Sequence, residues 1–160
     1  MSHELIADLK SQSTWKLFGL SVITFFVFTA HYMKRQTSII NDHYDHEDKI
    51  SEGFVAFVLV ISYLSLLFLF AYLFVDESHP IARVSNLVDR VSAVAYLVWG
   101  FKARKRMNII LCSERKTKMW FHGLWTFLFT PFYFNFKVNQ LNEEAEQALG
   151  GYADNRSESI

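Results

Sequence analysis

GFVAFVLVISYLSLLFLFAYLFV, residues 53–75, carries no charged side chain in 23 consecutive positions. At a helical rise of about 1.5 Å per residue, the stretch is roughly 34 Å long, enough to cross a hydrocarbon core of about 30 Å. Its few polar side chains are the hydroxyls of two serines and two tyrosines. Because lipid offers no hydrogen-bond partners, a chain crossing it must satisfy its backbone internally, as a helix does. The stretch therefore predicts a transmembrane helix.

The composition of the chain fits one membrane domain. Its 160 residues are 51% hydrophobic and 17% aromatic, with 16 Phe, which suits lipid-facing and interfacial surfaces. The net charge is zero, but seven basic residues gather between Lys102 and Lys118. The single cysteine, Cys112, excludes an intrachain disulfide. The first apolar run lacks a small-residue cleavage site, which predicts an uncleaved membrane helix rather than a signal peptide.

Four hydrophobic segments predict an all-α, polytopic membrane protein with a single membrane domain at 15–136. We expect transmembrane helices at about 15–33, 53–75, 84–101 and 119–136, after a polar segment at 1–14 and before an amphipathic to disordered acidic tail at 137–160. Asp89 and Arg90 interrupt the third segment, so we expect that end near an interface; the alternative is a helix lying along the surface. The short apolar patch at 107–112 indicates an amphipathic helix on the cytoplasmic side.

The distribution of Lys and Arg predicts the orientation. With four spans and both long connectors, 34–50 and 102–118, in the cytoplasm, ten positive charges lie inside and six outside. The reverse orientation gives six inside and ten outside, which the positive-inside rule disfavours. If the first or the fourth segment is a re-entrant hairpin rather than a span, the terminus beside it changes side.

The first and fourth segments resemble each other. FVFTAHYMKRQTSIIND (26–42) aligns without a gap over FLFTPFYFNFKVNQLNE (127–143), with a shared Phe-Thr-x-x-Tyr and a shared Asn nine residues later. This indicates an internal duplication; the alternative is chance similarity between two Phe-rich helices. We expect the two segments to pack against each other, with Thr29 and Thr130 at similar depths.

The same residues carry a resemblance to a known family. Trp15–Asn41 and Trp120–Asn142 each combine a Trp-led hydrophobic segment, Thr and Phe near its middle, an aromatic exit and a final Asn. This pattern resembles an uncharacterised bacterial family of small multi-span inner-membrane proteins, classed as a domain of unknown function. The resemblance implies a multi-pass protein of the bacterial cell inner membrane and brings no activity with it.

Polar residues inside the apolar segments are the first candidate site. In the fourth segment, polar residues recur every three or four positions and so share one helical face. One interpretation is a proton or ion path with histidines as titrating groups; the other, which we favour, is hydrogen bonding between helices. The residues expected to make these intramembrane contacts are Thr29, His31, Tyr32, His122, Thr126, Thr130 and Tyr133.

Two charged stretches are further candidates. The basic stretch adjoins membrane segments, so we expect anionic lipid headgroups as its partner and no nucleic acid. Its residues are Lys102, Arg104, Lys105, Arg106, Arg115, Lys116 and Lys118. The acidic connector offers oxygen and nitrogen donors at Asp42, His43, Asp45 and His46. A divalent metal accepts such donors, but short acidic runs are usually only solvated, so we expect no metal and no cofactor.

No motif in the sequence supports catalysis. Gly-rich phosphate loops, HExxH and GxSxG are all missing, and Cys112 has no activating partner in sequence. The leading hypothesis is therefore a non-enzymatic inner-membrane protein that binds another membrane protein or itself, as an accessory subunit or a toxin-immunity factor. The alternative is a small homo-oligomeric ion channel or transporter.

Overall fold

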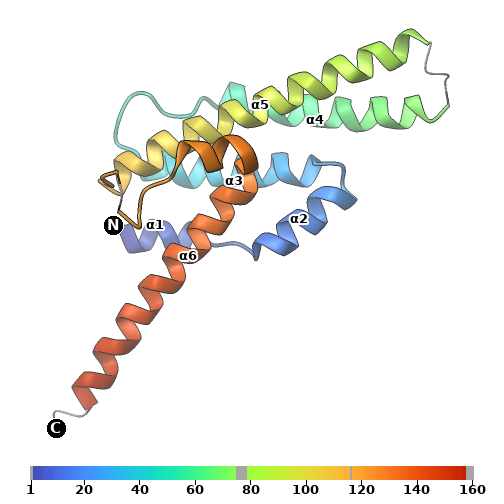
Figure 1. The fold of residues 1–160 in the computed structure, drawn as a ribbon. Helices are drawn as coiled ribbons and strands as arrows, with labels where there is room; N and C mark the ends of the chain where they lie inside the picture. Colours follow the sequence, from blue (N-terminus) through green and yellow to red (C-terminus); the bar gives the residue numbers. More distant parts are fainter. Residues whose placement is uncertain (1, 75–78, 116, 158–160) are drawn as a thin grey trace.

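The computed structural model describes residues 2–74, 79–115 and 117–157, and within these residues the fold is helical without strands (Figure 1). This confirms the all-α prediction. The helices are α1 (Ser2–Leu9), α2 (Thr14–Ile23), α3 (Val27–Asp42), α4 (Glu52–Tyr72), α5 (Pro80–Ile110) and α6 (Gly123–Ser157).

Helices α4 and α5 lie side by side as a long antiparallel hairpin (Figure 1). Pro80 occupies the first turn of α5, where its missing amide hydrogen has no helical partner to lose. His79 caps the same end, with its Nδ1 accepting from the Ile81 amide at 3.2 Å. The helix continues past its predicted end at Phe101 to Ile110. The basic residues 102–106 are therefore part of a long helix rather than of a loop.

The predicted helix at 15–33 is divided into two helices that fold back on each other (Figure 1). The turn lies at Phe25 and Phe26, whose φ angles of 47° and 65° are uncommon for bulky residues. Ser21 Oγ and Thr29 Oγ1, on opposite sides of the turn, lie 2.6 Å apart. Because this hydroxyl pair joins α2 to α3, the segment forms a helical hairpin and not one straight span.

The predicted helix at 119–136 is also bent. Thr130 has non-helical angles, φ 10° and ψ −92°, directly before Pro131. Proline removes one helical hydrogen bond and its ring clashes with the preceding turn, which is why the helix bends here. The second part of α6 then runs away from the α4–α5 hairpin (Figure 1). The helix continues to Ser157.

Helix α3 is the centre of the fold and packs against α1, α2, α4 and α5. Trp99 of α5 is fully buried and donates from Nε1 to Thr37 Oγ1 at 2.9 Å. Gln36, the residue before Thr37 in α3, donates from Nε2 to the Leu9 carbonyl oxygen at 3.1 Å, which holds α1 in place. These bonds satisfy polar groups that would otherwise be costly to bury.

One end of the molecule collects most of the connecting segments. There the 43–51 loop and the 111–122 segment meet α5, and α1 lies nearby (Figure 1). Asn135 of α6 donates to the Gln12 carbonyl oxygen at 3.0 Å and so joins the start of α2 to the same region. The α2–α3 turn points the other way, toward the end where α4 and α5 are connected (Figure 1). The α2–α3 hairpin and the bent 119–136 segment therefore both begin and end near the end of the molecule that carries these connecting segments.

Among the described residues, α4 alone is long and apolar enough to cross a membrane by length and composition.

Candidate functional site

The basic end of α5 is organised around Asp48 of the 43–51 loop. Its carboxylate accepts from Lys105 Nζ at 2.8 Å and from the Tyr44 hydroxyl at 2.6 Å. These hydrogen bonds, with that from Lys105 the stronger cause, lower the pKa of Asp48 to about 2. The carboxylate is therefore charged at neutral pH and ties the loop to the basic helix.

Arg106, which was predicted to bind headgroups, is 5% exposed. Its guanidinium donates to the Lys102 carbonyl oxygen at 3.0 Å and to the Asp48 carbonyl oxygen, and it lies 5.9 Å from the centre of the Tyr44 ring. A buried cation needs such partners, because desolvation without them is costly. Arg106 thus anchors the loop rather than facing a headgroup.

Arg104 holds the 111–122 segment against α5. Its Nε donates to the Phe121 carbonyl oxygen at 2.7 Å, and its guanidinium lies 5.5 Å from the centre of the Trp120 ring. The Asn108 Oδ1 accepts a hydrogen bond from the Phe121 amide at 2.8 Å. These contacts of Asn108 and Asp48 were not predicted, because their partners Phe121 and Lys105 lie 13 and 57 residues away in sequence.

The other basic residues are more open. Lys102 is half-buried, with Nζ 5.7 Å from the centre of the Phe54 ring, whereas Lys105, Arg115 and Lys118 are exposed. Lys118 Nζ lies 4.0 Å from Glu144 Oε1. Lys116 lies outside the described residues. Lys105, Arg115 and Lys118 therefore have the accessibility that headgroup contact requires.

The hydroxyl groups of the fourth segment form hydrogen bonds around the bend in α6. Thr126 Oγ1 donates to the His122 carbonyl oxygen at 2.9 Å, and Thr130 Oγ1 donates to the Thr126 carbonyl oxygen at 2.7 Å. The Tyr133 hydroxyl accepts from the His122 amide at 3.0 Å, across the bend. The two threonine hydroxyls therefore bond to backbone carbonyl oxygens of their own segment and not to another helix.

The polar residues of the first segment find partners elsewhere. His31 Nε2 lies 2.8 Å from the Tyr63 hydroxyl of α4, and Thr29 pairs with Ser21. Tyr32 is buried, and its hydroxyl has no hydrogen-bond partner among the described residues. These positions connect α3 to α2 and α4, which differs from the expected contact with the fourth segment.

The contact between the first and fourth segments runs through other residues than predicted. Phe18 and Phe132 meet edge to face with ring centres 5.5 Å apart. Asn135 Nδ2 donates to Thr14 Oγ1 at 3.1 Å. Thr29 pairs with Ser21 and Thr130 donates to the Thr126 carbonyl oxygen, so the two threonine hydroxyls do not bond to each other.

The residues considered for metal binding are spread apart. His43 Nε2 lies 3.7 Å from Asp8 Oδ2, while the His46 ring packs on Tyr44 with ring centres 4.9 Å apart. Asp42 and Asp45 are exposed. Within the described ranges, no group of three or more His, Cys, Asp or Glu side chains is arranged to hold a metal ion.

Large apolar side chains are exposed over much of the molecule. They lie on α2 and its turn, on α4, on α5, and from residue 119 to 136, whereas α3 has none that is exposed. Those more than half exposed include Trp15, Ile23, Val60, Leu67, Phe70, Leu73, Phe74, Leu87, Val94, Leu124, Phe127, Leu128, Phe129 and Phe136. A surface this apolar is typical of contact with lipid or with another protein.

Comparison of the chain with protein-family models, with curated proteins and with solved structures finds no match.

Proposed function

We propose that the chain is a non-enzymatic, multi-pass protein of the bacterial inner membrane that acts by binding another membrane protein or itself. In place of four spans, α4 and α5 cross the membrane. The α2–α3 hairpin and the bent 119–136 segment enter it from one side and return to that side. The accessory-subunit and toxin-immunity roles are both roles of this kind.

The exposure of α4 is the observation that carries the membrane part of the proposal. Only 22% of its most apolar 18-residue window is buried. The core helix of a soluble protein would be mostly buried, because exposing an apolar helix to water is unfavourable at about 25 cal/mol per Å². Surrounding lipid removes that cost. Exposed apolar residues also lie on α2, on α5 and in the 119–136 segment.

The charge distribution supports two spans and two re-entrant hairpins. In this arrangement both termini and the connectors 43–51 and 111–122 lie on one side of the membrane. Of the 16 Lys and Arg residues, only Arg83 and Arg90 then belong to the half of the hairpin on the other side. Fourteen against two is a stronger bias than the ten against six of the four-span arrangement, and it favours the cytoplasm for the basic side.

Single cysteines distinguish the two arrangements. In a Cys112→Ser background, we expect Ser11→Cys to be protected from a membrane-impermeant thiol reagent in intact cells and His79→Cys to be labelled. The original Cys112, which is exposed, serves as the cytoplasmic control. Four spans put residue 11 outside, so rapid labelling of Ser11→Cys before lysis would contradict the re-entrant arrangement.

Binding is favoured over conduction because the intramembrane hydroxyls bond inside the chain. Ser21 with Thr29, Thr126 and Thr130 with carbonyl oxygens, and Ser62 with Tyr96 leave no polar stripe continuous with solvent among these residues. Exposed aromatic side chains, in contrast, are common at protein interfaces. Trp125 and Phe129 stack on each other with ring centres 5.8 Å apart, on the exposed side of α6.

A photo-crosslinker tests the binding role. We expect a crosslinker placed at Trp125 to join the protein, in its native membrane, to a second copy or to one other membrane protein. Phe129→Ala should reduce the amount of that crosslinked product about tenfold. The same crosslinker at Leu67, which is also exposed and lies on α4, should react mainly with lipid. Crosslinking of both positions to lipid alone would contradict binding. Ion flux in liposomes that changes in His122→Ala or Thr126→Val would instead favour the channel.

A further inference from the structure

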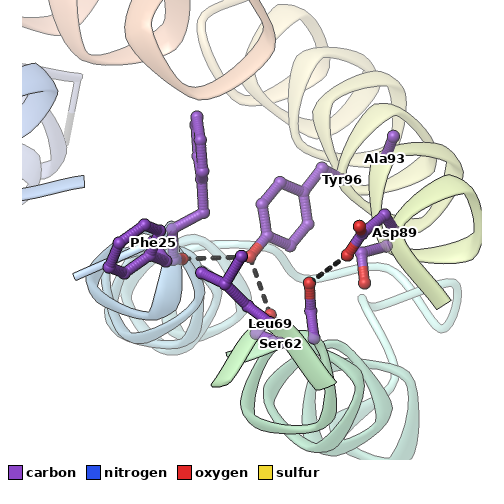
Figure 2. Close-up of a pocket in the computed structure, with 9 residues that line it drawn as sticks. Phe25, Ser62, Leu69, Asp89, Ala93 and Tyr96 are labelled. Carbon is purple, nitrogen blue, oxygen red and sulfur yellow. Dashed lines mark hydrogen bonds between the residues drawn. The ribbon is translucent and has the colours of Figure 1, made fainter. Parts of the chain in front are cut away.

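A cavity lies between the α2–α3 turn, α4 and α5, and neither Trp125 nor Phe129 lines it (Figure 2). Its volume is about 380 Å³, within the range of pockets that hold small organic ligands. Its walls are mostly apolar, with polar groups contributed by α4 and α5. The lining residues that matter below are Phe25, Phe26, Ser65, Leu69, Asp89 and Ala93.

The hydroxyl groups of the cavity are already engaged. The Tyr96 hydroxyl donates to the Phe26 carbonyl oxygen at 3.0 Å and lies 2.7 Å from Ser62 Oγ (Figure 2). Ser92 Oγ donates to the Val88 carbonyl oxygen at 2.9 Å. Ser65 donates to one carboxylate oxygen of Asp89. Little donor capacity therefore remains in the cavity for a ligand.

The carboxylate of Asp89 differs from these hydroxyl groups, because its negative charge has no positively charged partner in the described part of the chain. Among the described residues, no Lys, Arg or His nitrogen lies within 4.0 Å of it. Arg90 follows it in sequence, but successive residues of a helix point about 100° apart. Asp89 is exposed, ten residues into α5, and lines a cavity whose walls are mostly apolar. A carboxylate without a counter-charge in such a cavity favours a ligand of opposite charge.

We infer that this cavity binds an amphipathic molecule with a single amine group, reached from the lipid. The protonated amine donates to Asp89, and the apolar body lies against Phe25, Phe26 and Leu69. Charge complementarity selects an amine over an alcohol or an acid of the same chain length, because the hydroxyls of the cavity have their partners and the carboxylate repels a second anion.

Dodecylamine is a suitable probe, with dodecanol and dodecanoate as chain-matched controls. A ligand that binds the folded protein raises its melting temperature in a saturable way. In neutral maltoside micelles at pH 7, we expect such a rise with dodecylamine and none with the two controls. Asp89→Asn, which keeps the shape of the side chain, should weaken dodecylamine binding at least tenfold.

Two further variants keep the test decisive if Asp89→Asn folds poorly. Ala93→Phe fills the cavity but leaves the carboxylate, so it should abolish the shift. Arg90→Gln changes the neighbouring charge outside the lining and should leave the shift intact. The proposal is overturned if dodecanol stabilises the protein as well as dodecylamine does, if a folded Asp89→Asn binds equally well, or if dodecylamine produces no saturable shift.

Discussion

Trp99→Ala is expected to lower the free energy of unfolding by about 3–5 kcal/mol, the usual cost of removing a buried aromatic side chain. Trp99 is fully buried in α5, where its ring meets Phe134 edge to face with ring centres 5.4 Å apart. Its indole nitrogen also donates to Thr37 of α3. One side chain thus connects α3, α5 and α6, and its loss leaves a cavity among all three.

Trp15→Ala is the matched control, because Trp15 is 84% exposed. It removes the same atoms without opening a cavity, so the free energy of unfolding measured in micelles should change little. Trp99→Phe separates packing from hydrogen bonding. It keeps an aromatic ring but leaves the buried Thr37 hydroxyl without its donor, which should cost about 1–3 kcal/mol. Equal effects of Trp99→Ala and Trp15→Ala would show that this contact does not hold the helices together.

Gly100→Ala is expected to be destabilising for the opposite reason, since there is no room for the added methyl group. A Cβ at Gly100 would lie 2.6 Å from Thr130 Cγ2 and 3.2 Å from Thr126 Cγ2. Overpacking of this kind costs about 1–3 kcal/mol. Alanine also favours the helix by about 1 kcal/mol over glycine, so a net loss of stability would show that the clash dominates.

Thr130→Ser tests the cause of that loss. It removes the clashing methyl group and keeps the hydroxyl that bonds the Thr126 carbonyl oxygen. We therefore expect Gly100→Ala with Thr130→Ser to recover most of the stability lost by Gly100→Ala alone, as measured by a double-mutant cycle. Gly19→Ala, with nothing within 4 Å of its added Cβ, should be neutral or stabilising. Additive effects of the two changes would contradict the close approach of α5 to the bend in α6.

The candidate site was only partly predictable from the sequence. The hydroxyls at Thr126 and Thr130 were expected to bond between helices, but the structure gives them carbonyl partners four residues back in the same segment. Arg106 was expected at a headgroup but is buried against the 43–51 loop. Its partner Asp48 is 58 residues distant in sequence. No local pattern distinguishes Arg106 from the exposed Lys105 beside it.

The sequence by itself determined α4, because a charge-free apolar run of this length is typical of a helix. The start of α5 was expected at residue 84, but the helix begins at Pro80, where a proline suits a first turn. Only the tertiary structure decided that the first segment folds back at Phe25 and Phe26. No glycine or proline stands there, and the turn depends on the Ser21–Thr29 pair, which forms only once the two helices meet. The tertiary structure also decided the bend in α6 at Pro131, which packs against Gly100, a contact between residues that sequence periodicity does not relate.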